Sequence, residues 1–143
     1  DKVSVWDADE QDISRGADPW DSWDKVKEVK GFPGGLVRFL ETSTGQDGCG
    51  FLYPTPVQAY AWPILQAGKD LVAVAKTGSG KTLAFLLPGF IKLRKLKKSG
   101  EVDAAKGPVL LALTPTRELC NQIFMDASKF GKPVDITAAC AYG

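Results

Sequence analysis

Eight consecutive residues near the middle of the chain have the types and spacing of a loop that binds phosphate. They read Ala75, Lys76, Thr77, Gly78, Ser79, Gly80, Lys81 and Thr82. Gly78 and Gly80 let the backbone curl so that successive N–H groups point at phosphate oxygens. Lys81 supplies a mobile charge for the outer phosphates, and Thr82 offers a hydroxyl to Mg²⁺ or to its water shell. The pattern therefore predicts a nucleotide-phosphate site.

The sequence on either side of residues 75–82 supports this interpretation, although Ala75 replaces the glycine that usually begins the pattern. The apolar run 71–75 before the loop is typical of a buried strand. The apolar residues after it are spaced as one face of a helix: Leu83, Leu86, Leu87, Phe90 and Ile91. The helix N-terminus adds the positive end of a dipole. The alternative is a glycine-rich turn that caps a solvated helix, and the strand–loop–helix context argues against it.

The elements that must position this loop alternate along the chain. The apolar run 109–113 predicts a second buried strand, and the run 136–140 predicts a third strand. Thr55 and Pro56 predict a helix start, as N-cap and first residue, for a helix that extends to about Gln66. Thr116 predicts the cap of another helix, which ends at Gly131. The core face of that helix is expected to hold Leu119, Ile123, Phe124, Ala127 and Phe130. Alternating strands and helices predict an α/β fold with parallel strands.

The net charge of +1 conceals an uneven distribution over the 143 residues. The first 24 residues carry eight acidic and two basic side chains, and the remainder carries sixteen basic and nine acidic ones. A basic body suits a polyanionic partner, although surface charge for solubility is an equal alternative. The basic run 92–98 ends a helix, where cations are favourable, so a solvated face is the default over an RNA-binding patch.

Cysteine and histidine usage excludes several classes of site. Cys49, Cys120 and Cys140 lie far apart, and the chain has no histidine. A zinc site and a disulfide framework are therefore not expected, and an intracellular setting fits best, with nucleus and cytoplasm not distinguished. The sequence shows no apolar run of membrane-spanning length and no secretory signal, so no membrane partner is expected.

The N-terminal region is acidic and lacks a sustained apolar period, which predicts a tail or peripheral extension. Its three tryptophans, Trp6, Trp20 and Trp23, are unusual for a disordered segment. They anchor the region either on the body of the chain or on a partner. A short helical pattern follows at residues 36–40.

Taken together, the motifs resemble those of the DEAD-box RNA helicases. Residues 50–58, which read Gly-Phe-Leu-Tyr-Pro-Thr-Pro-Val-Gln, resemble the family's Q motif, and residues 75–82 match its motif I. Residues 115–119, Pro-Thr-Arg-Glu-Leu, match motif Ia, where the next residue is commonly Ala rather than Cys120. Residues 140–143 resemble the approach to the Gly-Gly motif. The resemblance covers roughly residues 32–143.

The resemblance implies a P-loop NTPase with a RecA-like parallel sheet and flanking helices, present here as an incomplete domain. It divides the chain into an acidic, Trp-containing extension at residues 1–31 and the first half of RecA-like helicase domain 1 at residues 32–143. It implies that ATP and Mg²⁺ are the cofactors and RNA the partner, bound through its backbone. Protein partners are not implied.

The resemblance also implies roles for particular residues. Gln58 would recognise adenine, since an amide both donates and accepts and so matches the N6 and N7 edge. An aromatic upstream would stack on the base, and both Phe32 and Trp23 are candidates. The implied ATP-binding residues are Phe32, Gln58, Ala75, Lys76, Thr77, Gly78, Ser79, Gly80, Lys81 and Thr82. Lys81 and Thr82 would be the catalytic residues, with Thr82 at the metal. The implied RNA-binding residues are Pro115, Thr116, Arg117 and Gly143.

The sequence departs from the family in what it lacks. It contains no Asp-Glu-Ala-Asp motif and no Ser-Ala-Thr motif. Phosphoryl transfer depends on positioning and charge stabilisation, and the family's acids for that task are missing. The expected function is the ATP-binding part of an ATP-dependent RNA helicase that remodels or unwinds duplexes, without hydrolysis by these residues alone. The alternatives are a DNA helicase or translocase, or a non-catalytic interaction module that uses the acidic tail.

Overall fold

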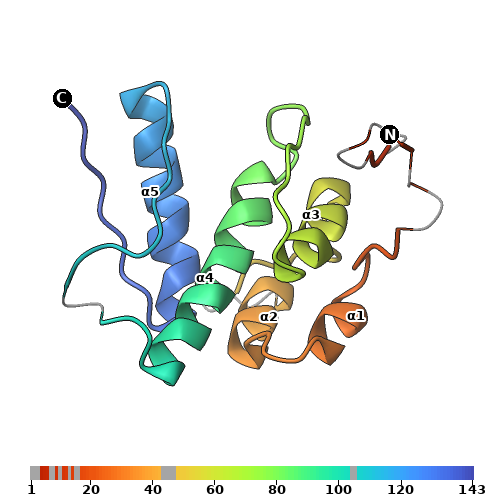
Figure 1. Ribbon diagram of the computed structural model, residues 1–143, viewed down its shortest axis with the longest axis horizontal. Helices are drawn as coiled ribbons and strands as arrows, with labels where there is room; N and C mark the ends of the chain where they lie inside the picture. Colours follow the sequence, from red (N-terminus) through yellow and green to blue (C-terminus); the bar gives the residue numbers. More distant parts are fainter. Residues whose placement is uncertain are drawn as a thin grey trace.

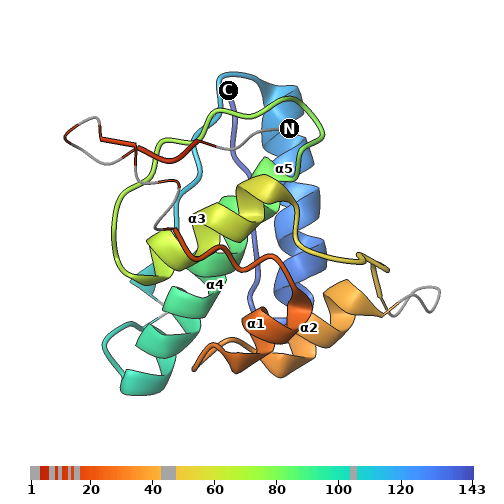
Figure 2. The same cartoon turned by 90° about the vertical axis from the view of Figure 1, so that its right-hand side faces the viewer.

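The computed structural model describes residues 4–6, 9, 11, 12, 14, 17–42, 48–103 and 106–143. Its α-helices lie side by side, with the long helix α4 between α3 and α5 (Figures 1 and 2). A short 3-10 helix, η3, follows α5. The elements in chain order are α1 (Trp23–Glu28), α2 (Gly34–Glu41), α3 (Pro56–Gln66), α4 (Lys81–Ser99), α5 (Arg117–Gly131) and η3 (Lys132–Val134).

Local sequence determines where α3 and α5 begin, and both predictions are confirmed. Thr55 is the N-cap of α3 and Pro56 its first residue, where the missing N–H of proline removes no hydrogen bond. Thr116 is the N-cap of α5, and its hydroxyl accepts a hydrogen bond of 3.2 Å from the Leu119 backbone N–H. These two caps fix where α3 and α5 begin, within the motifs at residues 50–58 and 115–119.

Helix α4 supplies the centre of the core. The five residues predicted for its apolar face, Leu83, Leu86, Leu87, Phe90 and Ile91, are all buried. Trp62 of α3 is fully buried against this helix, and its indole N–H donates a 3.2 Å hydrogen bond to the Leu83 carbonyl. Only the C-terminal part of α5 reaches the core, through Ala127 and Phe130. Leu119, in the first turn of α5, is exposed, so its predicted core position is wrong.

Residues 20–28 pack into the same core, and helix α1 is an element that the sequence pattern did not indicate. Trp23 is only 5% exposed, and its ring lies 6.2 Å from that of Trp62. Outside the core, Lys27 pairs with Glu41 of α2 at 2.9 Å, and this contact is the main cause of the raised pKa of Lys27. The division of the chain at residue 31 stays a prediction about domain organisation.

The three apolar runs predicted as strands are extended segments without strand pairing. No backbone hydrogen bond joins runs 71–75, 109–113 and 136–140 to one another within the described ranges. Their predicted burial is largely wrong, since Val72 and Val74 are 93% and 97% exposed and Leu111 and Leu113 are 78% and 85% exposed. Ile136 alone is a core residue. A strand is stable only beside a partner that takes its backbone hydrogen bonds, and none lies there. The parallel sheet itself stays a prediction.

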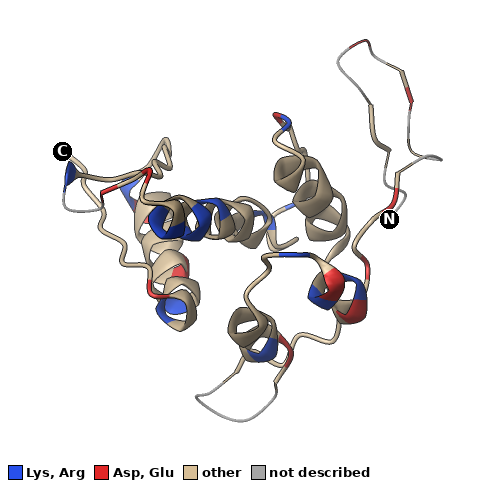
Figure 3. Cartoon of the chain, turned by 60° about the horizontal axis from the view of Figure 1, so that its bottom comes forward, with Lys and Arg blue, Asp and Glu red and all other residues tan. Residues whose placement is uncertain are grey.

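Charged residues are also unevenly placed in space (Figure 3). Lysine and arginine gather along the C-terminal part of α4, and acidic residues lie on the N-terminal segment and α1. Lys97 of the basic run lies 3.8 Å from the carboxylate of Asp135, so part of this charge is neutralised locally. No helix within the described ranges has both the length and the apolar character needed to span a membrane.

Asp126 on α5 gives a testable link between burial and pH. Partial burial raises the pKa of its carboxyl, against the smaller opposing effect of Lys129. A folded-state pKa above the unfolded value means that the folded state binds the proton more tightly. The contribution of Asp126 to the free energy of unfolding therefore falls as pH rises from the unfolded pKa, near 3.8, through the higher folded-state pKa. Asp126→Asn is expected to remove this loss and to raise stability slightly at neutral pH. Urea unfolding at pH 3.5 and 7 measures it, and a variant that loses stability at pH 7 would contradict the assignment.

Candidate nucleotide and RNA sites

The predicted phosphate loop lies between the extended run 71–75 and the start of α4. Gly78 and Gly80 have φ angles of 77° and 89°, in the left-handed region that favours glycine. Gly80 is also the N-cap of α4, so the first N–H groups of that helix face the loop. Both glycines therefore adopt backbone conformations that other residues rarely adopt, while the predicted curl of N–H groups around phosphate stays a prediction.

Gln58 ties this loop to the start of α3. Its side-chain N–H donates a 3.1 Å hydrogen bond to the Gly80 carbonyl, 22 residues away in sequence. Its amide oxygen accepts a 3.0 Å hydrogen bond from the Thr55 backbone N–H. A Cβ atom on residue 80 would lie 2.5 Å from the Gln58 amide nitrogen and 2.9 Å from the Thr55 hydroxyl oxygen. Only glycine leaves room for this contact, and the two predicted motifs form one unit.

The Gln58 amide keeps hydrogen-bonding capacity after making these two bonds. Its NH₂ group has two N–H donors and its oxygen has two lone pairs, of which the protein uses one each. The side chain is buried, and its two hydrogen bonds hold it in one orientation. An amide held in this way can still donate to one atom and accept from another.

A cavity of about 390 Å³ opens beside Gln58. Its wall is formed by residues from the segment before α3, from the first turn of α3, from the phosphate loop and from the first turn of α4: Gly50, Phe51, Leu52, Tyr53, Thr55, Gln58, Gly78, Gly80 and Leu83. This volume lies in the usual range for small-molecule sites. Phe51, Leu52 and Tyr53 are wall residues to which the sequence interpretation gave no role, although they stand in the quoted motif. Their aromatic and apolar side chains were the feature of the sequence that could have indicated a ligand-binding wall.

Neither candidate for the stacking aromatic lines this cavity. Phe32 is half-buried, with its ring 6.0 Å from that of Trp62 and 6.4 Å from that of Trp20. Trp23 is buried, and its indole N–H donates a 2.7 Å hydrogen bond to the carbonyl of Phe51. Trp23 thus supports a wall of the cavity from behind. The choice between the two as a stacking residue stays a prediction.

The polar groups of the loop fit a phosphate ligand. The Lys81 ammonium donates to the carbonyl oxygens of Ala75 and Lys76, the second at 2.7 Å. The hydroxyl oxygen of Ser79 is buried and has no hydrogen-bond partner among the described residues. A buried hydroxyl without a partner is unfavourable, and a phosphate oxygen can supply one. A Cβ position on Gly78 has no atom within 4 Å, so space is open above the loop.

The described residues near the loop would offer Mg²⁺ fewer protein ligands than a dedicated metal site does. Within the described part of the chain, no group of three or more His, Cys, Asp or Glu side chains could hold a metal ion. Thr82 lies half-buried in the first turn of α4, directly after Lys81. A single hydroxyl fits Mg²⁺ that takes its other ligands from phosphates and water, as this cation commonly does.

The residues predicted to bind RNA lie around the start of α5. Pro115, Thr116 and Arg117 are exposed, and so is Gly143 at the other end of the final segment. The Arg117 guanidinium carbon lies 5.8 Å from the centroid of the Tyr142 ring. The fold therefore brings Arg117 next to Tyr142, the residue that precedes Gly143. Tyr142 was not among the predicted site residues.

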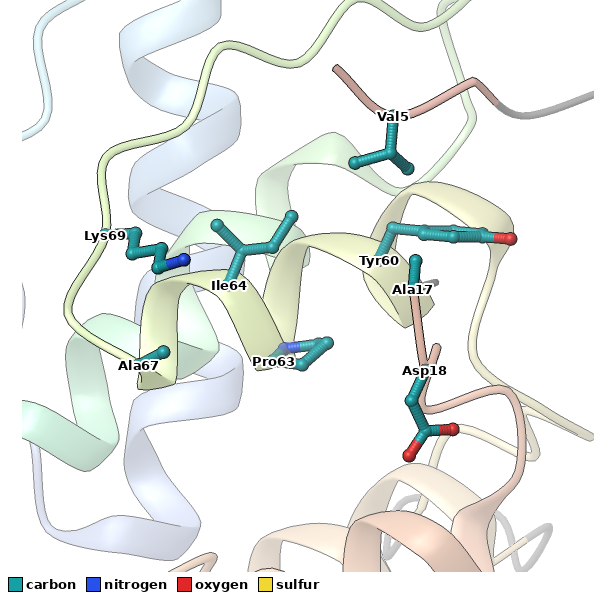
Figure 4. Close-up of a pocket in the computed structure, with 8 residues that line it drawn as sticks. All are labelled: Val5, Ala17, Asp18, Tyr60, Pro63, Ile64, Ala67 and Lys69. Atoms are coloured by element: carbon teal, nitrogen blue, oxygen red, sulfur yellow. The ribbon is translucent and has the colours of Figure 1, made fainter. Parts of the chain in front are cut away.

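A second cavity, of about 220 Å³, lies apart from both sites (Figure 4). It is bounded by the N-terminal segment and the outer face of α3. Its lining residues are Val5, Ala17, Asp18, Tyr60, Pro63, Ile64, Ala67 and Lys69. None of them is among the predicted site residues.

Comparison with known proteins relates these sites to a family. The model of the family described as DEAD/DEAH box helicase matches residues 55–143. The chain is 47% identical to DEAD-box ATP-dependent RNA helicase 14 of Arabidopsis thaliana over 116 residues, 81% of this chain and 17% of that protein. It is equally identical to the ATP-dependent RNA helicase-like protein DB10 of Nicotiana sylvestris over 116 residues, 81% of this chain and 18% of that protein. The chain thus spans less than a fifth of these curated relatives.

Solved structures give the same relationship at the level of the fold. The chain is similar to the RNA helicase Prp28 from Chaetomium thermophilum bound to ADP, with a TM-score of 0.63 and 40% identity over 81% of this chain and 26% of that one. It is also similar to the yeast DEAD-box splicing factor Prp28, with a TM-score of 0.60 and 29% identity over 89% of this chain and 30% of that one.

Proposed function

Because the chain belongs to the DEAD/DEAH box helicase family, we propose that it is the ATP-binding part of an ATP-dependent RNA helicase that remodels or unwinds RNA duplexes. The observation that carries this proposal is the contact between Gln58 and Gly80 at the edge of the 390 Å³ cavity. It joins a side chain that can recognise a base to a loop that can bind phosphates. ADP in the related Prp28 structure supports the same ligand class.

In the proposed complex the adenine enters the cavity beside Gln58. The free N–H of the amide donates to N7, and the free lone pair of the oxygen accepts from the N6 amino group. Phe51 and Tyr53 give the cavity aromatic surface against which a base can pack. The triphosphate then extends toward Gly78 and the start of α4, where backbone N–H groups and the helix dipole favour negative charge.

Lys81 changes partners when phosphate binds in this proposal. Its ammonium leaves the loop carbonyls and pairs with the outer phosphates, which attract it more strongly than neutral carbonyls do. The Thr82 hydroxyl would hold Mg²⁺, which would supply positive charge against the phosphates. The Ser79 hydroxyl donates to a phosphate oxygen and so gains the partner that it lacks. The sequence holds no Asp-Glu-Ala-Asp motif, so we propose binding without turnover by these residues.

Base selectivity tests the proposal. Isothermal titration of the chain with ADP and with GDP is expected to favour ADP by about 5- to 150-fold, since guanine presents O6 where adenine presents an amino donor. Gln58→Ala is expected to reduce this ratio toward one. The variant is also expected to weaken binding of ADP and GDP alike, because the contact with Gly80 is lost. The ratio of the two affinities is therefore the decisive quantity.

The matched control for this experiment is Gln122→Ala, which removes an exposed glutamine from α5. It is expected to leave both affinities unchanged. Equal affinity of the unmodified chain for ADP and GDP, with no effect of Gln58→Ala on either, would overturn the assignment of the base site.

On the RNA side, we propose that Arg117 binds a backbone phosphate, with Pro115, Thr116 and Gly143 beside it. The exposed guanidinium at the start of α5 and the family membership support this role. A DNA helicase or translocase is the alternative within the same family model. Competition between RNA and DNA oligonucleotides of one sequence distinguishes the two, because only RNA has the 2′-hydroxyl.

We also propose that runs 71–75, 109–113 and 136–140 are strands of a RecA-like parallel sheet in a longer polypeptide. Their apolar composition and the exposure of Val72, Val74, Leu111 and Leu113 support this, because such surfaces favour being covered. The similarity to the two Prp28 structures supports it as well. An intracellular setting remains a proposal that rests on the three unpaired cysteines.

A further inference from the structure

The final segment of the chain returns along α5. After η3 the backbone reverses, and residues 136–143 pass beside the helix so that the C-terminal end lies near the helix start (Figures 1 and 2). The reversal is closed by a 3.0 Å hydrogen bond from the Ile136 N–H to the Gly131 carbonyl. A Cβ atom on residue 131 would lie 2.7 Å from the Ile136 carbonyl oxygen, so glycine permits this close approach.

Two contacts further along fix the register of the segment on the helix. The Cys140 thiol donates to the Asn121 side-chain oxygen at 3.7 Å, and the Tyr142 ring lies 5.8 Å from the Arg117 guanidinium carbon. Four helical residues span about 6 Å and two extended residues span about 6.6 Å. The step from Cys140 to Tyr142 therefore matches the step from Asn121 back to Arg117. The antiparallel return thus delivers the Tyr142 ring to Arg117.

Among the described residues, no ion pair occupies the N–H groups of the Arg117 guanidinium. An aromatic ring interacts with a cation through its π face, whereas a phosphate is bound through the in-plane N–H groups of a guanidinium. The Arg117 side chain is exposed. Tyr142 is 54% exposed, so the pair lies open on the surface.

We propose that Tyr142 is a positioning residue that holds the Arg117 guanidinium in the orientation that binds an RNA phosphate. This inference rests on the proposed RNA contact of Arg117. A long arginine side chain loses conformational freedom when it binds, and an existing ring contact removes part of that loss beforehand. Tyr142 therefore acts through Arg117, and its effect is independent of base sequence.

A double-mutant cycle tests the proposal in the full-length protein that contains this chain. The probes are single-stranded oligo-A and oligo-U RNA, measured by fluorescence anisotropy over a range of salt concentrations. Arg117→Ala is expected to weaken binding of both and to lower the slope of log affinity against log salt by about 0.7. Tyr142→Ala is expected to weaken both RNAs about two- to fivefold. In the Arg117→Ala background, Tyr142→Ala is expected to have no further effect.

Two conservative variants provide the matched controls. Tyr142→Phe keeps the ring and is expected to bind RNA as the unmodified protein does. Tyr142→Leu keeps an apolar side chain without a π face and is expected to match Tyr142→Ala. Since Tyr142 is exposed, thermal unfolding is expected to be unchanged in both variants.

Three contrary outcomes distinguish the RNA contact of Arg117 from the positioning role of Tyr142. If Arg117→Ala leaves affinity and salt slope unchanged, the proposed RNA contact itself fails. If Arg117→Ala weakens binding while Tyr142→Ala and Tyr142→Leu do not, only the positioning role is overturned. If Tyr142→Ala weakens binding equally with and without Arg117, the tyrosine contacts RNA directly and the positioning role is again overturned.

Discussion

Replacing Gly80 by alanine is expected to destabilise the folded chain by about 1.5–3.5 kcal/mol and to reduce its preference for ADP over GDP. A non-glycine residue at φ 89° costs about 1–2 kcal/mol. The new Cβ atom would also lie 2.5 Å from the Gln58 amide nitrogen, so the side chain must leave and its hydrogen bond to residue 80 is lost. A hydrogen bond of this kind contributes about 0.5–1.5 kcal/mol. Urea unfolding measures the loss of stability, and titration with ADP and with GDP measures the loss of selectivity.

Gly78→Ala is the matched control for this prediction. Residue 78 has nearly the same φ angle, 77°, but a Cβ atom there meets no atom within 4 Å. Gly78→Ala is therefore expected to introduce backbone strain without displacing Gln58. Gly80→Ala should reduce the preference for ADP over GDP, and Gly78→Ala should preserve it. Equal loss of selectivity in the two variants would show that Gln58 is not the link between loop and base.

Replacing Trp62 by alanine is expected to destabilise the chain by about 3–5 kcal/mol. Trp62 is fully buried, and its ring lies 6.2 Å from that of Trp23 and 6.0 Å from that of Phe32. Its indole N–H also holds the Leu83 carbonyl in the first turn of α4. Truncation would leave a large cavity at the point where α1, α3 and α4 meet. Urea unfolding followed by circular dichroism measures the loss.

Two variants separate the contributions of Trp62. Trp62→Phe keeps an aromatic ring but removes the N–H donor, so it is expected to lose less stability than Trp62→Ala. Trp6→Ala removes a tryptophan that is 60% exposed and is expected to change stability by less than about 0.5 kcal/mol. If Trp62→Ala unfolds at the same urea concentration as Trp6→Ala, the aromatic cluster does not hold α1 to the core.

The features that depend on neighbouring residues could be predicted from the sequence. The caps Thr55 and Thr116 and the apolar spacing of α4 act within a few turns, and the structure confirms the helices that they predicted. Gly78 and Gly80 were expected to let the backbone curl, and both have positive φ angles. For the candidate site, the family resemblance implied that Gln58 and the loop bind one ligand, and both line one cavity, while their binding roles stay predictions.

The features that depend on distant contacts could not be predicted. Helix α1 has only six residues, which is too short to be stable alone, and it forms because Trp23 and Val26 find Trp62 and the rest of the core. The acidic residues around α1 gave this region the composition of a peripheral tail, so the sequence pattern did not indicate that packing. The contact of Tyr142 with Arg117 requires the whole length of α5 and the turn at Gly131. Burial of the extended runs depends on partners that are not adjacent in sequence.

The exposed runs 71–75 and 109–113 also set an order of events during protein synthesis. The helices close through contacts between near neighbours and form early, whereas extended segments await partners from elsewhere. Until then Val72, Val74, Leu111 and Leu113 present apolar side chains beside backbone groups that can pair with another polypeptide. A nascent chain of this kind is therefore expected to be most prone to aggregation in the interval before these apolar runs are covered.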